Sequence, residues 1–153
     1  MKKKVRSELF NTPFEMSLRI SLLLSSAPDM LFSLDRLLCL DFIVCYASEF
    51  GFPYDNLQGD NDYKYGEMVG RRILIQEALK DIVIRGLVNV SIKDGYVFSA
   101  TDVLLDYSKN MESDYAEEYR EIAEEVTSAY ISESDNSLLQ MIQNESLRSG
   151  KEM

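Results

Sequence analysis

The segment 67–99 constrains the fold more than any other part of the chain. Its helical pattern ends at Gly86, which can close a helix in the left-handed conformation. Two strand patterns follow, at residues 87–92 and 96–99, and Asp94-Gly95 between them is a strong hairpin signal. A helix that leads into a tight hairpin is typical of a winged helix-turn-helix. We therefore predict a mainly helical α+β fold with a winged helix-turn-helix core, a β-hairpin wing and flanking N- and C-terminal helices.

The length and the helix-start signals predict one winged-helix domain, with its flanking helices, at residues 9–131. The 153 residues suit a single core. Thr12 with Pro13, Ser33 and Ser113 can begin helices that end near residues 27, 50 and 131. A short helix is expected at 64–70, a longer one at 71–85, and another helical stretch after residue 101. Residues 132–153 are predicted to form a polar, partly flexible C-terminal tail.

The charge of the chain argues against direct DNA binding. The formal net charge is -10. Residues 101–153 carry 13 acidic and 4 basic side chains, whereas residues 1–100 carry 13 acidic and 12 basic side chains. Most of such a surface repels a phosphate backbone. Residue chemistry alone thus supports a small non-enzymatic winged domain and does not identify its partner.

The sequence offers no catalytic residue. It contains no histidine, which removes the usual Ser-His and Cys-His pairs and histidine metal ligands. The acidic side chains cluster on a helix that we expect to be exposed, and no glycine-rich phosphate loop is present. We therefore expect no enzyme activity, no cofactor, no metal and no small-molecule substrate.

Two further features concern the environment of the protein. Cys39 and Cys45 are six residues apart in a predicted helix, about 9 Å at 1.5 Å per residue, too far for a disulfide. They are predicted to be reduced core thiols. The chain shows no export signal and no membrane span, so we expect a cytoplasmic protein.

An apolar seam on the last predicted helix has two interpretations. Its residues recur at helical spacing: Tyr115, Tyr119, Ile122, Val126 and Tyr130. The seam either packs on the chain's own domain or is offered to a partner helix, such as an ATPase coiled coil.

Five polar residues are candidates for DNA contact in the alternative function, a winged-helix transcriptional regulator. Arg71, Arg72, Gln76 and Lys80 lie on the predicted recognition helix, and Lys93 lies on the predicted wing. The competing interpretation is that the two arginines pair with carboxylates of the chain itself or of a partner protein.

Several motifs resemble the middle component of ABC-three-component systems, bacterial defence operons of the Lamassu type. They cover roughly residues 9–130 and occur in order: Asn11 to Arg19 (NTPFEMSLR), Leu34 to Leu37 (LDRL) with Asp41 and Phe42, Asn56 to Asn61 (NLQGDN), and Arg71-Arg72. The chain has Gln58 where histidine is common in this family.

The resemblance implies an accessory, non-catalytic subunit. Such a subunit binds an SMC-like ABC ATPase and couples it to an effector, often a nuclease, in defence against phage or plasmids, and meets DNA indirectly through the complex. We expect the partner contacts at Arg71, Arg72, the loop with Asn56, Asp60 and Asn61, and the seam with Tyr115, Tyr119, Ile122 and Val126.

Overall fold

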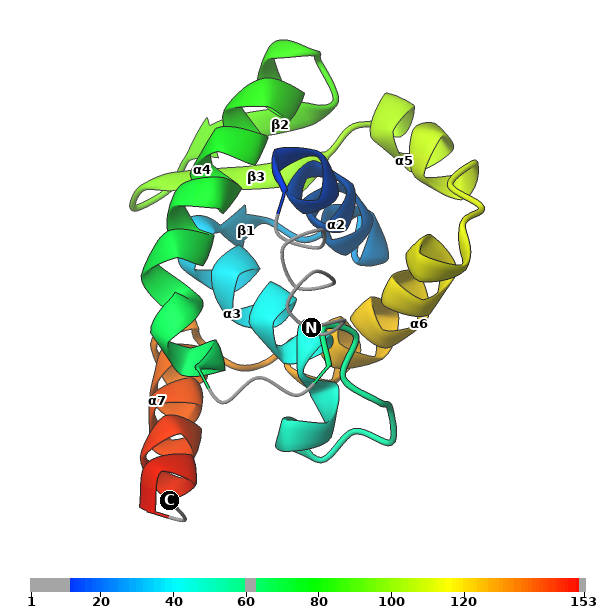
Figure 1. Cartoon of the computed structure of the whole chain (residues 1–153). Coiled ribbons are helices and arrows are strands. Elements are labelled where there is room, and N and C mark those ends of the chain that lie inside the picture. The colour runs from blue at the N-terminus through cyan, green and yellow to red at the C-terminus, as the bar shows by residue number, and fades with distance from the viewer. Residues whose placement is uncertain (1–11, 60–62, 152–153) are drawn as a thin grey trace.

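The computed structural model describes residues 12–59 and 63–151 and has a mainly helical α+β architecture (Figure 1). This confirms the mainly helical α+β part of the predicted fold class. In chain order the elements are α2 (Pro13–Ser26), β1 (Phe32–Ser33), α3 (Leu34–Cys45), 3₁₀ turns at Ala47–Phe50 and Lys64–Glu67, α4 (Met68–Ile84), β2 (Val88–Ile92), β3 (Tyr96–Ala100), α5 (Asp102–Lys109), α6 (Asp114–Ala129) and α7 (Asp135–Lys151).

Side-chain caps begin the helices at the predicted positions. The hydroxyl of Thr12 accepts a hydrogen bond from the Glu15 amide at 3.2 Å, and Ser33 and Ser113 cap α3 and α6 in the same way. Each cap supplies an acceptor to one of the amide groups that have no partner inside the helix.

Gly86 ends α4 and a hairpin follows, as predicted, but the hairpin loop has three residues, 93–95, and not the two residues of the Asp94-Gly95 signal. Gly86 has a φ of 78°, its amide donates to Val83, and the Leu87 amide donates to Ile82. This pair of bonds is the Schellman motif, which ends α4 and directs the chain into β2. In the hairpin loop Asp94 and Gly95 have φ values of 53° and 109°, a region that glycine and aspartate tolerate better than most residues.

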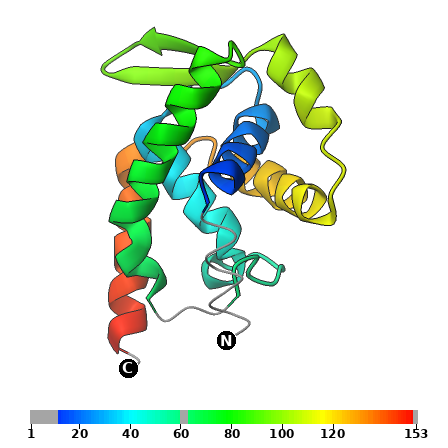
Figure 2. The ribbon, with the colours of Figure 1, turned by 45° about the horizontal axis from the view of Figure 1, so that its top comes forward.

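A small antiparallel sheet closes one end of the molecule. Its strand order is β1-β3-β2, so β3 lies in the middle. The hairpin pairs Val88 with Ala100 and Ile92 with Tyr96, and Phe32 of β1 pairs with Phe98. Figure 2 shows the hairpin projecting beyond the helices at the end where α4 finishes. The two-residue strand β1 has no signal in the sequence pattern.

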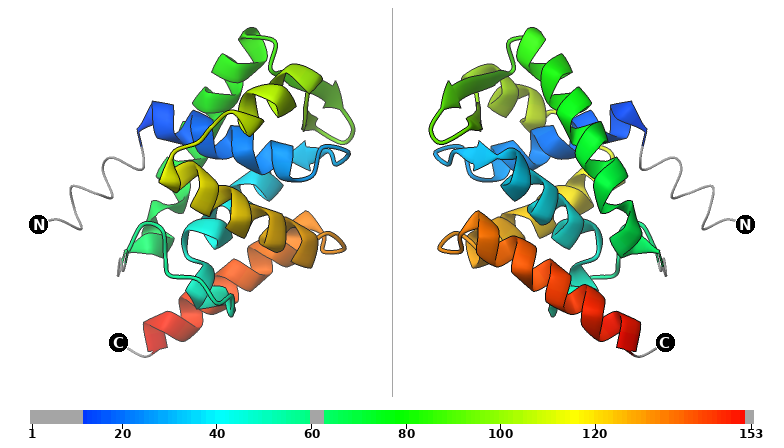
Figure 3. Two further views of the ribbon diagram at one scale, coloured as in Figure 1. Left: turned by 90° about the vertical axis from the view of Figure 1, so that its right-hand side faces the viewer. Right: turned by 90° about the vertical axis from the view of Figure 1, so that its left-hand side faces the viewer.

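Helix α2 is the centre of the helical core. It packs against both α4 and α6, and α3 packs against α4, α6 and α7. The two side views show α2, α6 and α7 at successive levels, moving away from the hairpin (Figure 3). Helix α2 is buried over most of its length because its apolar residues 20 and 22–24 all lie in the core.

Two element boundaries differ from the sequence analysis. Helix α3 ends at Cys45, and a separate 3₁₀ turn occupies Ala47–Phe50 before Gly51, which has a φ of 86°. The break falls at Tyr46, whose ψ of 43° is not helical. Helix α4 begins at Met68, three residues earlier than predicted, and a 3₁₀ turn replaces most of the short helix expected before it.

The prediction of a C-terminal tail was wrong for residues 135–151, which form α7. Arg36 holds the start of this segment: it donates to the Tyr130 and Glu133 carbonyls and forms an ion pair with Asp135 at 3.2 Å. Leu138 and Ile142, four residues apart, are buried against the core. The five apolar residues of this polar segment are a weak signal, and the helix packs on α3.

Replacing Leu138 by alanine tests this packing. Leu138 is fully buried, so we expect Leu138→Ala to lower the free energy of unfolding by about 2 to 4 kcal/mol. Leu147→Ala in the same helix is the control, because that side chain is 61% exposed and should cost less than about 0.5 kcal/mol. Urea unfolding measures both, and equal small effects contradict the packing of α7.

Candidate functional site

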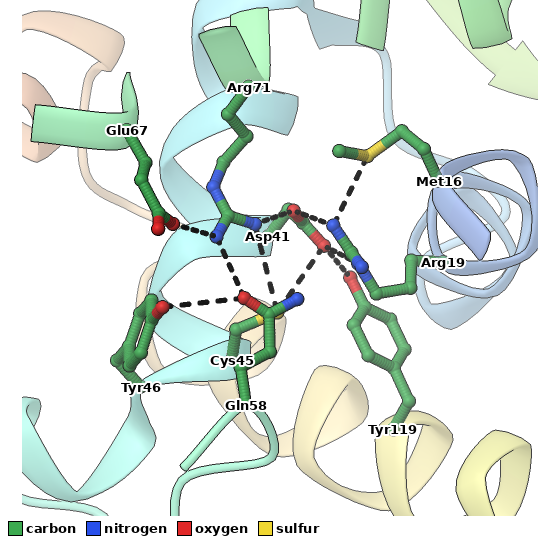
Figure 4. A network of polar contacts seen from close by, with 9 residues as sticks. All are labelled: Met16, Arg19, Asp41, Cys45, Tyr46, Gln58, Glu67, Arg71 and Tyr119. Atoms are coloured by element: carbon green, nitrogen blue, oxygen red, sulfur yellow. Dashed lines mark hydrogen bonds and ion pairs between the residues drawn. The ribbon is translucent and has the colours of Figure 1, made fainter. Parts of the chain in front are cut away.

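A buried carboxylate, Asp41 of α3, joins four helices. Arg19 of α2 donates to it twice, through Nε at 3.0 Å and Nη2 at 3.2 Å. Arg71 of α4 donates through Nη1 at 2.7 Å, and Tyr119 of α6 donates through Oη at 2.8 Å (Figure 4). Asp41, Arg19 and Tyr119 are fully buried, so these contacts are shielded from water.

Arg71 has further partners that fix its direction. Its Nη2 atom donates to Oε1 of Gln58 at 3.0 Å, and the Tyr46 hydroxyl donates to the same oxygen at 3.4 Å. The Oε2 atom of Glu67, four residues earlier in the chain, lies 4.0 Å from Nη2 of Arg71. The guanidinium also lies over the Phe42 ring, 5.6 Å from its centroid. The α4 helix is thus held to α3 and to the loop that carries Gln58.

The charges of this network keep Asp41 ionised. Burial alone raises the pKa of a carboxyl group. The charges of Arg19 and Arg71, with the hydrogen bonds from Arg19 and Tyr119, outweigh burial and lower the pKa of Asp41 from 3.8 to about 2. Burial raises the pKa of Cys45 to about 11 and that of Cys39 to about 12. Both thiols are free, buried and protonated near neutral pH, which suits core packing and not nucleophilic chemistry.

The structure corrects the interpretation of Arg71 as a surface residue. Arg71 is 3% exposed and its guanidinium faces the core, so in this fold it contacts neither a partner protein nor DNA. Arg72 is half-exposed and pairs with Asp35 of α3. Both arginines therefore bind carboxylates of the chain itself.

The apolar seam on α6 packs against the core of the protein. Tyr119, Ile122 and Val126 are buried, and Tyr115 is partly buried against the same core. The α6 helix packs on α2 and α3, which occupy the face that was a candidate for a partner helix. The expectation that these four residues contact a partner was therefore wrong for this conformation.

The candidate loop is only partly described. Asn56 is half-buried, and its Oδ1 atom accepts from the Ser48 amide at 3.2 Å and from the Ser48 hydroxyl at 2.7 Å. It thereby closes the loop locally. Asp60 and Asn61 lie outside the described residues.

The remaining candidates lie on α4 and on the hairpin loop. Gln76, Lys80 and Lys93 are all exposed there. Large apolar side chains lie among them, with the exposed fractions Val69 74%, Ile73 52%, Ile84 84% and Ile92 74%. The sequence analysis missed these apolar residues, because the helical pattern was interpreted only through its polar positions.

A groove of about 690 Å³ lies between α4 and the hairpin. Arg72, Gln76 and Lys80 line one side, and Asp94 and Tyr96 line the other. Its remaining lining is mostly apolar, with Leu34, Leu79, Val83, Val90 and Phe98. The charged residues in the lining are two cations and two carboxylates, so the groove has no net charge.

The described residues lack two features that mark other classes of protein. They contain no group of three or more Cys, Asp or Glu side chains arranged to hold a metal ion. Across residues 12–59 and 63–151, no helix is long and apolar enough to cross a membrane.

Arg19 and Asp41 are the residues of the network that sequence reasoning missed. Each is a single charge in an apolar helical run, Arg19 among residues 18–24 and Asp41 among residues 37–45. A charge in such a run is buried only if it is paired. Two apolar runs, one with a single basic residue and the other with a single acidic residue, therefore indicated a buried ion pair.

Comparison with known proteins shows the family. Residues 9–152 match the family model described as ABC-three component (ABC-3C) system Middle Component 2. The match covers nearly the whole chain, so the protein belongs to this family of middle components, as the motifs indicated. No curated protein and no solved structure matches the chain.

Removing the charge of Asp41 tests the network. Asp41→Asn leaves Arg19 and Arg71 buried without a carboxylate, so we expect the free energy of unfolding to fall by about 3 to 5 kcal/mol. The control Asp81→Asn breaks an exposed ion pair with Arg85 and should change the free energy of unfolding by less than about 0.5 kcal/mol. A small effect of Asp41→Asn in urea unfolding contradicts a structural role for the pair.

The same network predicts a sensitivity to acid. The pKa of Asp41 is about 2 in the folded state and 3.8 in the unfolded state. Its contribution to the free energy of unfolding is therefore complete above pH 3.8 and is lost as the pH falls through 2. We expect the stability difference between wild type and Asp41→Asn to shrink by about 2 kcal/mol from about pH 5 to about pH 2. Urea titrations of both proteins across this range measure it, and a constant difference rules it out.

Proposed function

We propose that this chain is a non-catalytic accessory subunit that binds an SMC-like ABC ATPase and couples it to an effector. In this proposal the effector is a nuclease and the system acts against phage or plasmids, as in the Lamassu type. Membership of the middle-component family supports the part of the proposal that concerns a multi-component system. The protein then acts in the cytoplasm and meets DNA through the assembled complex.

We infer that residues 13–100 form a winged helix-turn-helix. The order of elements supports this: a helix, a short strand, two helices and a hairpin, with the first strand paired to the second strand of the hairpin. In that arrangement α4 occupies the position of the recognition helix, and the loop at residues 93–95 is the tip of the wing.

The exposed apolar side chains of α4 are the observation that carries the adaptor function. A recognition helix that reads DNA presents polar and basic groups to base edges and phosphates. Here Val69, Ile73 and Ile84 occupy the outer surface of the helix. Burial of such residues against a protein surface is energetically favourable, whereas contact with a phosphate backbone gives no such gain.

A second function, direct DNA binding by a transcriptional regulator, rests on three residues of the same surface. Gln76, Lys80 and Lys93 are exposed, and neither lysine forms an ion pair within the described part of the chain. This arrangement predicts duplex binding by the purified chain alone, with an affinity that falls steeply as salt is raised.

Purification of the tagged chain, expressed with the other genes of its operon, distinguishes the two functions. We expect an SMC-like ATPase to co-purify at a fixed ratio, measured by mass spectrometry and by the mass of the native complex. A solitary chain that binds duplex DNA at low salt contradicts the adaptor function and supports the regulator. An ATPase-bound chain without DNA affinity of its own excludes the regulator.

A further inference from the structure

The strand β2 has an open edge. It is an outer strand of the sheet and pairs only with β3, and the hairpin that carries it projects beyond the helices (Figure 2). All its residues after Val88 are exposed. Within the described part of the chain, only β3 and α4 pack closely on this strand. An edge of this kind can pair with one further strand.

Two backbone hydrogen bonds at the ends of the hairpin show which residues of β2 face β3. The Thr101 amide donates to the Leu87 carbonyl at 3.3 Å, and the Lys93 amide donates to the Gly95 carbonyl at 2.8 Å. In an antiparallel pair, successive residues point their amide and carbonyl groups alternately toward the neighbouring strand and away from it. The odd-numbered residues of β2 therefore bond to β3, and the even-numbered residues point to the open edge.

The backbone groups of Val90 and Ile92 are the accessible part of this edge. Val90 is 41% exposed and Ile92 is 74% exposed, whereas Val88 is 5% exposed. The amides and carbonyls of Val90 and Ile92 form no hydrogen bond with any residue that the structure describes. Two amides and two carbonyls are thus available to a further strand.

The edge also lacks the features that normally prevent pairing with another chain. Proteins protect an edge strand with a charged side chain, a proline or a bulge. Residues 88–92 (VNVSI) contain no charged residue and no proline, and their register with β3 is continuous from Val88 to Ile92. Pairing at this edge is therefore not blocked by the strand itself.

The side chains of this strand are self-complementary about Ser91. When two copies lie antiparallel with Ser91 opposite Ser91, Val90 of one copy lies opposite Ile92 of the other, and Asn89 lies opposite Lys93. Aliphatic groups then meet aliphatic groups, hydroxyl meets hydroxyl, and amide meets ammonium. Such pairs stabilise a sheet, and no like charges face each other.

We propose that the β2 edge is a self-association site, at which a second copy of this chain pairs with the first in the register centred on Ser91. The two three-stranded sheets then form one sheet about a two-fold axis. Val90 of each copy exchanges two backbone hydrogen bonds with Ile92 of the other. A second copy matches the edge at every position from Asn89 to Lys93. The inference goes beyond the proposed function and does not depend on it.

The net charge of the chain permits this contact. Residues 87–100, which form the hairpin, contain one cation and one carboxylate, Lys93 and Asp94, so the surfaces that meet are neutral. The acidic excess lies in residues 101–153 and repels over a longer range, where salt screens it. We therefore expect the dimer to become tighter as the salt concentration rises.

A proline at position 90 tests the backbone pairing. The Val90 amide faces the open edge, so Val90→Pro keeps the bonds to β3 but removes two of the bonds between copies and places the ring against the second strand. The control Val90→Ala removes the aliphatic side chain and keeps the amide. We expect Val90→Pro to weaken dimerisation of the purified full chain about tenfold more than Val90→Ala. Sedimentation equilibrium measures both, and circular dichroism verifies folding.

Charges at position 89 test the register. Asn89→Lys places a cation opposite Lys93 of the second copy, and we expect dimerisation to weaken at least about threefold, although the formal net charge falls from -10 to -9. Asn89→Asp should strengthen dimerisation, although its formal net charge is -11. The double variant Asn89→Lys with Lys93→Glu should recover the affinity of wild type. Effects that follow net charge instead contradict this register.

Three results would overturn the inference. The first is a wild-type chain that stays monomeric up to about 1 mM, where weak association is detected. The second is a dimer that Val90→Pro and Asn89→Lys leave unchanged, which places the contact on another surface. The third is a monomeric chain whose binding to another protein of its operon is lost in Val90→Pro, which assigns the edge to a strand of that protein.

Discussion

The buried contact between Asp41 and its two arginines sets the arrangement of the helices. Apolar cores tolerate several packings of similar volume, but a buried charge without a partner is costly. Asp41 on α3 must meet Arg19 on α2 and Arg71 on α4, and it also accepts a hydrogen bond from Tyr119 on α6. A shifted or rotated helix leaves at least one of these groups unpaired in the core. The network therefore specifies one packing among those that hydrophobic burial allows.

The same contact determines which face of α4 is outside. Residues two apart on a helix point about 200° away from each other. Arg71 faces the core, so Val69 and Ile73, which are two positions before and after it, face outward. The exposure of Val69 and Ile73 is thus a geometric consequence of the buried arginine.

Local signals predicted the elements better than the roles of their residues. Thr12, Ser33 and Gly86 act through backbone groups next to them in the chain, so their effects are visible in sequence, and the structure confirms them. The burial of Arg71 and Tyr119 depends on their contacts with Asp41, which lies 30 positions from Arg71 and 78 positions from Tyr119 in the chain. Spacing along one helix identifies a face but not what covers it. For the same reason α7 was missed, since its few apolar residues form a helix only against α3.

Local surface chemistry is a stronger guide to the partner than net charge. The excess of acidic residues lies in residues 101–153, and α2 lies between α6 and α4, in contact with both. One helix is about 10 Å across, and charges in salt solution are screened over about 8 Å. The acidic side chains of α6 therefore act weakly at the outer face of α4. The residues that α4 exposes there, the apolar Val69 and Ile73 together with the polar Gln76 and Lys80, therefore describe this surface better than the net charge of the chain does.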